Sequence, residues 1–423
     1  MLIPIRQNFP HRALPDIPRA VANELTASCL ASRLSKGSRV AIGVGSRGIS
    51  NIAVIVRAVV DYFAAEGMRP FLFPAMGSHG AGTAEGQASV LTHYGIDEST
   101  MGCPVESSFE VVSLGRTELG IEAFAGRDAW QSDGVFLVSR VKWHTSFAGA
   151  IESGVAKMVA IGLGKIYGAQ SVHGHARRHG MEASIRSVAT RVLASGKVLG
   201  GLGILEDAYH DTAMVAALPA ENLIEREEKL LVTVKSWMGR IPVPAVDVLI
   251  VDEMGKNISG TGMDLKVINR GVLAQYNPWP DTPVIERIFV RDLSELSSGN
   301  GNGIGAADVL HDRVLEKLDV NAGRVNAMTS GNLPLVRTPL HFPSDRECFE
   351  CVASTVGKFN RDDVTVAWIH NTMELGTLAL SENLTDEIAQ NPMLSVAGPR
   401  FELEFDSAGN LGNLPCATTA SHA

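Results

Sequence analysis

The chain lacks several features that would place it in a common class of proteins. It has only five cysteines among 423 residues, an odd and scattered set that is typical of a reducing compartment rather than of a disulfide framework. It also lacks a basic surplus, because 37 Lys and Arg stand against 46 Asp and Glu. The net charge of −9 argues against a nucleic-acid or anionic-membrane partner, since either needs a positive face. No apolar run reaches the roughly 20 residues that span a bilayer. These absences favour a cytoplasmic protein.

Familiar catalytic and metal motifs are missing as well. The chain contains no G-x-S-x-G, HExxH or EF-hand pattern, so a serine hydrolase, a zincin or a calcium protein is not indicated. Cys348 and Cys351 have metal or redox spacing, but no second pair accompanies them. What remains is a composition of 45% hydrophobic and 20% charged residues, which predicts a globular chain with sizeable buried cores.

The order of apolar runs and amphipathic stretches predicts an α/β fold. Buried strands alternate with helices, and this alternation is typical of mostly parallel sheets covered by helices. Ser50 and Thr83 are expected to cap helices, and Gly67 is expected to end one. The predicted strands of this first series are 39–45, 69–77 and 133–144, and the predicted helices are 50–67, 182–196 and 220–239.

A proline-punctuated stretch at 240–246 predicts a domain boundary. The sequence therefore predicts a first domain over 1–243 and a second α/β domain over 244–391, with 392–423 as a segment that can return to the first. The second domain has predicted strands at 246–255, 284–293 and 362–371 and a glycine-rich loop at 294–308. The active site is expected in the cleft between the domains.

Four side chains suited to an anionic ligand follow four different predicted strands. They are Arg47, His79, His144 and Lys256. Because ligands of parallel sheets bind at the carboxyl ends of the strands, one shared anion site explains them better than four separate turns. The two histidines are candidates for proton transfer, since imidazole titrates near neutral pH.

The segment from residue 153 to residue 179 is rich in glycine and also contains several lysines and histidines. Lys157 lies in an otherwise apolar stretch; if buried it would be nucleophilic, and the alternative is a lysine that extends to the surface, as expected for Lys165. His173, His175 and His179 form either a metal-ligand cluster or a solvated basic turn, and the sequence leaves both open.

These residues resemble the nickel-pincer-nucleotide-dependent lactate racemase family. Ser46-Arg47 is similar to the family's arginine turn, with Gly48 in place of its proline, and the "GSHG" that begins at Gly77 is similar to its first histidine turn. The segment "HTSFAGAIESGVAK", from His144 to Lys157, is similar to the family's second histidine segment, with a short insertion. Lys157 and His173 are sixteen residues apart, as are the family's tethering lysine and metal-binding histidine.

The resemblance implies a cofactor and a reaction. The cofactor would be nickel pyridinium-3,5-bisthiocarboxylic acid mononucleotide, joined covalently to Lys157, with His173 binding the Ni and with Ser46, Arg47 and Gly77 beside it. Imidazole suits nickel. The reaction would be racemisation or epimerisation of a 2-hydroxy acid by hydride transfer at C2. His79 and His144 would be the acid and base, and Arg47 and Lys256 would bind anionic groups.

The substrate is expected to be larger than lactate, such as the sugar acid gluconate, because the stretch after Lys256 is rich in hydrogen-bonding side chains. Expected partners are the small 2-hydroxy acid, transiently the enzymes that make the cofactor, and a second copy in a possible homo-oligomer. Two other hypotheses stay open: a His-ligated metal-dependent enzyme without the pincer cofactor, and a non-catalytic nickel or cofactor carrier.

Overall fold

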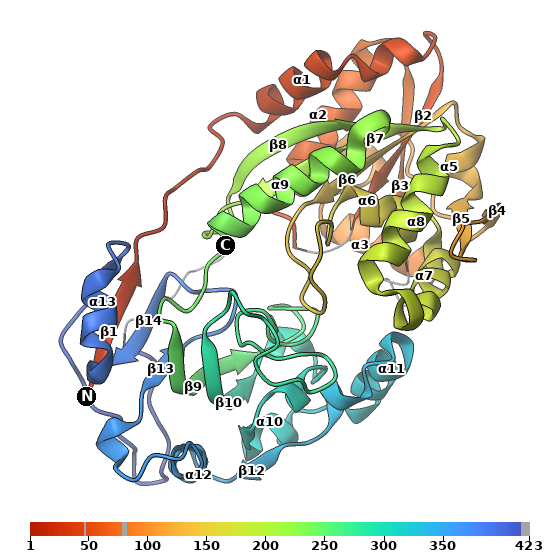
Figure 1. Ribbon diagram of the computed structural model, residues 1–423. Helices are drawn as coiled ribbons and strands as arrows, with labels where there is room; N and C mark the ends of the chain where they lie inside the picture. Colours follow the sequence, from red (N-terminus) through yellow and green to blue (C-terminus); the bar gives the residue numbers. More distant parts are fainter. Residues whose placement is uncertain (46–47, 78–82, 416–423) are drawn as a thin grey trace. The chain divides into compact units, whose positions relative to one another are not determined.

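The computed structural model describes residues 1–45, 48–77 and 83–415, and the chain forms two compact units. The stretch His11–Met238 is one, called here the continuous unit. Met1–Pro10 and Gly239–Ala423 together form the other, called the split unit. Each unit is built on its own mostly parallel sheet with helices (Figure 1), which confirms the predicted α/β class.

The sheet of the continuous unit has the strand order β3-β2-β6-β7-β8. Its first four strands are parallel, and β8 pairs antiparallel with β7. A separate antiparallel pair is formed by β4 and β5. The bounds of these strands are β2 (Arg39–Val44), β3 (Arg69–Pro74), β4 (Val111–Arg116), β5 (Glu122–Gly126), β6 (Gly134–Arg140), β7 (Val198–Glu206) and β8 (Thr212–Pro219).

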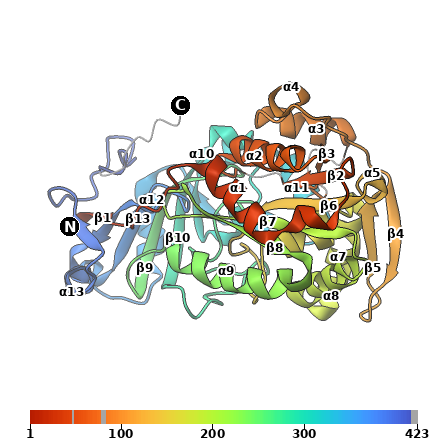
Figure 2. The same cartoon turned by 90° about the horizontal axis from the view of Figure 1, so that it is seen from above.

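Helices cover both faces of this sheet (Figure 2), with α1 and α2 on one face and α7, α8 and α9 on the other. The helices are α1 (Ile17–Ser28), α2 (Ile52–Ala65), α3 (Ala84–His93), α4 (Glu98–Met101), α5 (Arg127–Gln131), α6 (Val155–Lys157), the π-helix η3 (Met158–Gly162), α7 (Lys165–His179), α8 (Met181–Leu193) and α9 (Leu223–Trp237).

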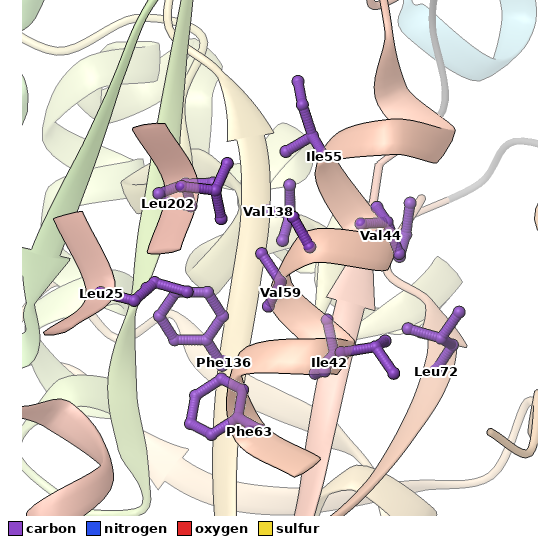
Figure 3. Close-up of a cluster of buried hydrophobic side chains, with 14 of the residues drawn as sticks. Leu25, Ile42, Val44, Ile55, Val59, Phe63, Leu72, Phe136, Val138 and Leu202 are labelled. Carbon is purple, nitrogen blue, oxygen red and sulfur yellow. The ribbon is translucent and has the colours of Figure 1, made fainter. Parts of the chain in front are cut away.

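The alternation of side chains along the strands explains the two layers. Phe136 and Val138 of β6 pack against α1 and α2, whereas Val135 and Leu137 pack under α6 to α8. Figure 3 shows the first of these cores, where α1 and α2 cover the strands with Leu25, Ile55, Val59 and Phe63. Because both faces of the strands are buried, their sequences are continuously apolar, which is why the pattern was readable.

Two predicted helix caps have different outcomes. Thr83 is the N-cap of α3, and its side chain accepts a hydrogen bond from the Gly86 N–H, as predicted. The prediction for Ser50 was wrong, since α2 begins at Ile52 with Asn51 as its N-cap. The Ser50 hydroxyl donates instead to the His210 carbonyl at 2.5 Å.

The split unit has an eight-stranded sheet of order β12-β11-β10-β9-β13-β14-β1-β15. Neighbours from β12 to β13 are parallel, and those from β13 to β15 are antiparallel. Its elements are β1 (Leu2–Gln7), β9 (Ala245–Met254), β10 (Val284–Leu293), β11 (Val309–His311), α10 (Asp312–Glu316), α11 (Val320–Ser330), β12 (Leu340–Phe342), α12 (Asp345–Ser354), β13 (Val366–Ile369), β14 (Thr377–Ser381), α13 (Thr385–Gln390) and β15 (Leu394–Val396).

The units differ from the predicted domains at both ends of the chain. The boundary lies between Met238 and Gly239, and β1 belongs to the split unit, where it pairs with β14 and β15. The described part of 392–423 also stays in the split unit rather than returning to the first domain. The reason is apolar burial, because Leu411 and Leu414 join the core formed by β9, β10 and α12.

Among the described residues, no helix combines the length and the apolar character that crossing a membrane requires.

Candidate functional site

Three loops of the continuous unit leave adjacent strands at one edge of its sheet. β3, β2 and β6 are neighbours and parallel, so their carboxyl ends lie side by side. The chain runs outward from β2 to β3 and then crosses to the other side of β2 for β6. This makes the carboxyl ends of β2 and β6 a topological switch point, where α/β sheets bind ligands. Ser46, Arg47 and His79 lie outside the described residues, so their roles stay predictions.

Gly77 ends the described part of the loop after β3. It is buried and has a φ of +62°, which glycine adopts readily and other residues rarely do. A Cβ at this position would lie 3.2 Å from the Ile161 side chain of η3. Gly77 thus packs the loop against η3, and its role in binding a cofactor stays a prediction.

His144 lies beyond the end of β6, which stops at Arg140 rather than at residue 144. Its half-buried ring is stacked at a tilt on Phe147, with 4.5 Å between centroids. Its Nδ1 accepts the Ser146 backbone N–H at 3.1 Å and lies 2.9 Å from the Ser146 hydroxyl. Because Nδ1 is an acceptor here, the neutral ring carries its proton on Nε2.

A buried carboxylate holds the loop that carries His144. The Glu152 side chain accepts the backbone N–H groups of His144 at 2.5 Å and of Gly149 at 3.2 Å. Lys235 of α9 pairs with the same carboxylate at 2.6 Å and also donates to the Gly149 carbonyl at 3.3 Å. The position of His144 is therefore linked to α9 through Glu152.

The segment from Lys157 to His173 is not one helix. It consists of α6, the π-helix η3, a turn and then α7, whose first residue, Lys165, has a φ of +53°. In a continuous α-helix two residues sixteen apart would be about 24 Å apart along the axis. The break folds α7 back against η3, and the charge of Lys157 consequently reaches His173.

His173 is neutral at physiological pH. Burial among surrounding protein atoms and, second, the charge of Lys157 lower its pKa from 6.5 to about 4. His173 is nevertheless exposed to solvent, and water weakens the effect of burial on this pKa. A neutral imidazole keeps a lone pair for a metal ion, whereas the protonated form has none.

The glycines of this segment serve close packing. A Cβ on Gly164 would lie 2.8 Å from the Gly168 Cα, and one on Gly168 would lie 3.0 Å from the Ile161 carbonyl oxygen. A Cβ on Gly162 would lie 2.4 Å from the Ala75 carbonyl oxygen. Gly168 thus lets α7 approach η3, Gly162 lets η3 approach the loop after β3, and Gly164 lets the turn before α7 pack tightly against Gly168. At Gly174, by contrast, a Cβ would meet nothing within 4 Å.

The other two histidines of α7 lie one turn apart on its surface. The rings of His175 and His179 are stacked with 6.4 Å between centroids, and His175 Nδ1 lies 2.9 Å from the Ser171 carbonyl oxygen. Within residues 1–45, 48–77 and 83–415, no group of three or more His, Cys, Asp or Glu side chains is arranged to hold a metal ion.

Lys256 follows β9 in the split unit. Its ammonium group donates to the Gly260 carbonyl at 2.8 Å and to the Asn326 side chain at 2.9 Å. β9 lies between β10 and β13, and the chain reaches β13 only after β10, β11 and β12. Lys256 is therefore at the switch point of its own sheet, and its catalytic role stays a prediction.

Lys165 differs from the sequence expectation. It was expected to extend to the surface, but only 2% of it is exposed. Its ammonium group donates to the Pro74 carbonyl at 2.5 Å and lies 5.3 Å from the centre of the Phe73 ring. Burial lowers its pKa to about 8, which the nearby Asp128 carboxylate partly opposes.

Sequence reasoning missed Glu227, which contacts the backbone immediately before Lys157. It lies on the buried face of α9 with Leu223, Leu231 and Val234. Its carboxylate accepts the Ala156 N–H at 3.0 Å. A signal was present in the sequence, since Glu227 occupies an apolar position of the helical repeat, where a charged residue is unusual.

Sequence reasoning also missed Glu206, the last residue of β7. It is 6% exposed, forms an ion pair with Arg140 and accepts the Ser50 N–H at 2.9 Å. Arg140 in turn donates to the Gly48 carbonyl at 3.0 Å. Together they fasten the chain that follows β2 to the ends of β6 and β7.

Comparison with known proteins supports the fold. No family model matches the sequence, and no curated protein matches it. Among solved structures, the lactate racemase apoprotein from Thermoanaerobacterium thermosaccharolyticum is similar, with a TM-score of 0.50 and 12% sequence identity. The match covers 84% of this chain and 90% of that chain. At this identity the likeness shows a shared α/β fold.

Proposed function

We propose that this chain is a racemase or epimerase of 2-hydroxy acids that uses a nickel-pincer nucleotide. The observation that carries the proposal is the break between η3 and α7, which packs the helix carrying His173 against the segment that directly follows Lys157. The Lys157 charge also lowers the His173 pKa. The fold shared with a lactate racemase apoprotein supports the same reaction class.

The donor chemistry of the pair fits such a cofactor. Lys157 offers a half-buried primary amine for a covalent bond, and His173 offers a neutral nitrogen ligand of the kind nickel accepts. When bound, the nucleotide would supply an acceptor for the hydride from C2. The expected contributions of Ser46, Arg47 and Gly77 to its binding are part of the proposal.

The hydrogen bonds of His144 support a role in proton transfer at its Nε2. Since its Nδ1 accepts from Ser146, the neutral ring holds its proton on Nε2 and presents it there as a hydrogen-bond donor. For one enantiomer, His79 would remove the hydroxyl proton, and His144 in its protonated form would return a proton to the oxygen of the planar 2-keto acid on the opposite face. For the other enantiomer the two roles exchange.

Polar groups in the split unit support a proposal for the substrate class. Ser259, Thr261 and Asp264 stay buried after β9 although they are polar. The Asn302 side-chain oxygen is buried without a hydrogen-bond partner among the described residues. A buried acceptor of this kind is stabilised by a hydroxyl donor, so we propose a polyhydroxylated acid such as gluconate. The anion-binding roles predicted for Lys256 and for Arg47 are part of the proposal.

Attachment of the cofactor is the first test. The chain is co-expressed with the cofactor-making enzymes, and intact protein is weighed by mass spectrometry. We expect an added mass that disappears in Lys157→Ala and persists in Lys36→Ala, a matched change at an exposed lysine. An unmodified wild-type chain, or an addition that survives Lys157→Ala, would contradict the proposal.

The reaction is the second test. The loaded protein is incubated with a panel of 2-hydroxy acids in deuterated water, and the products are separated by chiral chromatography. We expect inversion at C2 with little deuterium incorporation, and faster turnover of aldonic acids than of lactate. Extensive deuterium at C2 would indicate a carbanion instead, and a strong preference for lactate would refute the substrate class.

A further inference from the structure

Helix α9 of the continuous unit contacts the chain near Lys157 and also near His144, the two candidate functional residues described above. Glu227 of α9 reaches the residues before Lys157. Two turns further along the same helix, Lys235 reaches the loop that carries His144 through Glu152. We propose that α9 positions the site, with Glu227 fixing the backbone of Lys157 and Lys235 fixing that of His144. Their description as positioning residues rests on the proposed function.

The contact at Glu227 replaces a helix cap. The backbone N–H groups at the start of a helix have no partner within the helix, and a side-chain oxygen usually accepts one of them from the N-cap position. Gly154 has no side chain to do so, and α6 has no cap of its own. The Glu227 carboxylate supplies the missing acceptor to Ala156 from 71 residues further along the chain.

The absence of a side chain at Gly154 makes room for the Glu227 carboxylate. A Cβ there would lie 2.4 Å from the Glu227 carboxyl carbon and 2.5 and 2.6 Å from its two oxygens. The φ of Gly154 is 169°, an extended conformation that any residue adopts, so backbone strain does not require glycine. Glycine is required at this position because the Glu227 carboxylate approaches it so closely.

The placement of Glu227 is costly, which argues against a role in general packing. The side chain is 1% exposed, and one of its oxygens has no hydrogen-bond partner among the described residues. An apolar residue would suit the buried face of α9 better, but it would leave the Ala156 N–H without an acceptor. The benefit of Glu227 is thus the hydrogen bond that it accepts from the backbone just before Lys157.

The second contact works through an ion pair. Glu152 bridges the His144 and Gly149 N–H groups, and the Lys235 ammonium balances its buried charge. Removing one partner of a buried pair leaves the other uncompensated, so loss of Lys235 would loosen the bridge. His144 and Lys157 would then shift independently of each other.

Amide hydrogen exchange of the full chain without cofactor tests the proposal directly. At pH 8, where the Glu227 carboxyl is ionised, we expect Glu227→Ala and Gly154→Ala each to accelerate exchange at Ala156 by about tenfold or more, the loss expected for a hydrogen bond to a charged group. Lys235→Met should accelerate exchange at His144 and Gly149 instead. Glu227→Gln, which keeps an acceptor oxygen, should restore most of the protection at Ala156.

Two control variants on α9 separate positioning from stability. Leu231→Ala removes a buried side chain one turn from Glu227, and Lys229→Met removes an exposed charge. Both should leave the relative protection of Ala156, His144 and Gly149 unchanged. Equal acceleration in the controls, or unchanged exchange in Glu227→Ala and Gly154→Ala, would overturn the proposal. The loaded protein adds a second readout, a slower covalent attachment at Lys157 in Gly154→Ala.

The two proposals fail in different ways. If the wild-type chain takes up no nucleotide, the proposed function is contradicted. The positioning role of α9 is still tested by the hydrogen-exchange pattern in that case. A chain that takes up the nucleotide normally in all variants, with local exchange unchanged, contradicts the role of α9 alone.

Discussion

Two buried ionisable side chains, Glu227 and Lys165, give the continuous unit a characteristic pH dependence. Burial raises the pKa of Glu227 to about 7, and the Ala156 and Val155 N–H groups oppose this only in part. Burial lowers the pKa of Lys165 to about 8. Both side chains are therefore harder to ionise in the folded state, and each costs stability in the pH range where its unfolded form is charged.

Glu227→Gln should change how stability depends on pH. The usual pKa of the carboxyl is 4.5, so below that pH it is protonated in both states and costs nothing. As the pH rises from 4.5 to about 7, the unfolded state ionises first, and the wild type loses about 1.4 kcal/mol of stability for each pH unit. Between pH 5 and pH 8 we expect the wild type to lose about 2 to 3 kcal/mol relative to Glu227→Gln. Urea unfolding at both pH values measures this, and parallel profiles would contradict it.

Lys165→Met should show the opposite trend at alkaline pH. The folded ammonium group loses its proton near pH 8, and the unfolded one near 10.5. Below pH 8 the wild type carries the full cost of burying the charge, and this cost disappears as the pH rises toward 10.5. We expect the wild type to gain about 2 kcal/mol relative to Lys165→Met between pH 7.5 and pH 10. Thermal unfolding at both pH values tests this, and a constant difference would show that the ammonium group is hydrated.

At the scale of elements, the tightly packed turn at Gly164, which joins η3 to α7, sets the course of the helix that carries His173. Gly164→Ala would place a Cβ 2.8 Å from the Gly168 Cα and 2.9 Å from the Phe124 carbonyl oxygen. We expect a loss of about 1 to 3 kcal/mol in the free energy of unfolding, because backbone atoms cannot yield as a side chain can. Gly174→Ala is the matched control on the same helix. Its Cβ meets open space, and it should stabilise by about 0.5 to 1 kcal/mol. Equal effects of the two changes would refute the packing role.

The elements that the sequence predicted best are those with continuous apolar character. The strand predicted at 284–293 coincides with β10, and the strand predicted at 246–255 differs from β9 by one residue at each end. The strand predicted at 362–371 is shorter in the structure, Val366–Ile369, because its acidic start forms a 3-10 turn. Periodicity located these elements, and the ends depended on local polar contacts.

The candidate site was less readable because its geometry depends on contacts between distant residues. The resemblance to the lactate racemase family singled out Lys157 and His173, but the break near Lys165 between them depends on packing of α7 against η3. Glu227 belongs to a run of charged residues in which only the helical period distinguishes it. Its partner Ala156 is 71 residues away, a relation that one sequence does not reveal.

At the scale of the whole molecule, the two units differ in how the chain builds them. The continuous unit uses one uninterrupted stretch, whereas the split unit needs β1 from the beginning of the chain. β1 lies between β14 and β15, with Leu2, Ile3 and Ile5 buried. Without β1, β14 would lose one neighbour and β15 would lose its partner strand in the sheet.

Separate expression of the two units should therefore give unequal results. A fragment of residues 11–238 contains both layers of its core and should unfold in one cooperative transition. A fragment of residues 239–423 lacks β1, exposes the apolar edge of β14 and should aggregate or lack a transition. Joining residues 1–10 to its C-terminus through a flexible linker should restore cooperative unfolding, because β1 pairs by its backbone and burial rather than by its place in the chain. Calorimetry and circular dichroism measure both outcomes. A stable 239–423 fragment would mean that β1 contributes little to the split unit, and an unfolded 11–238 fragment would mean that the continuous unit needs the rest of the chain.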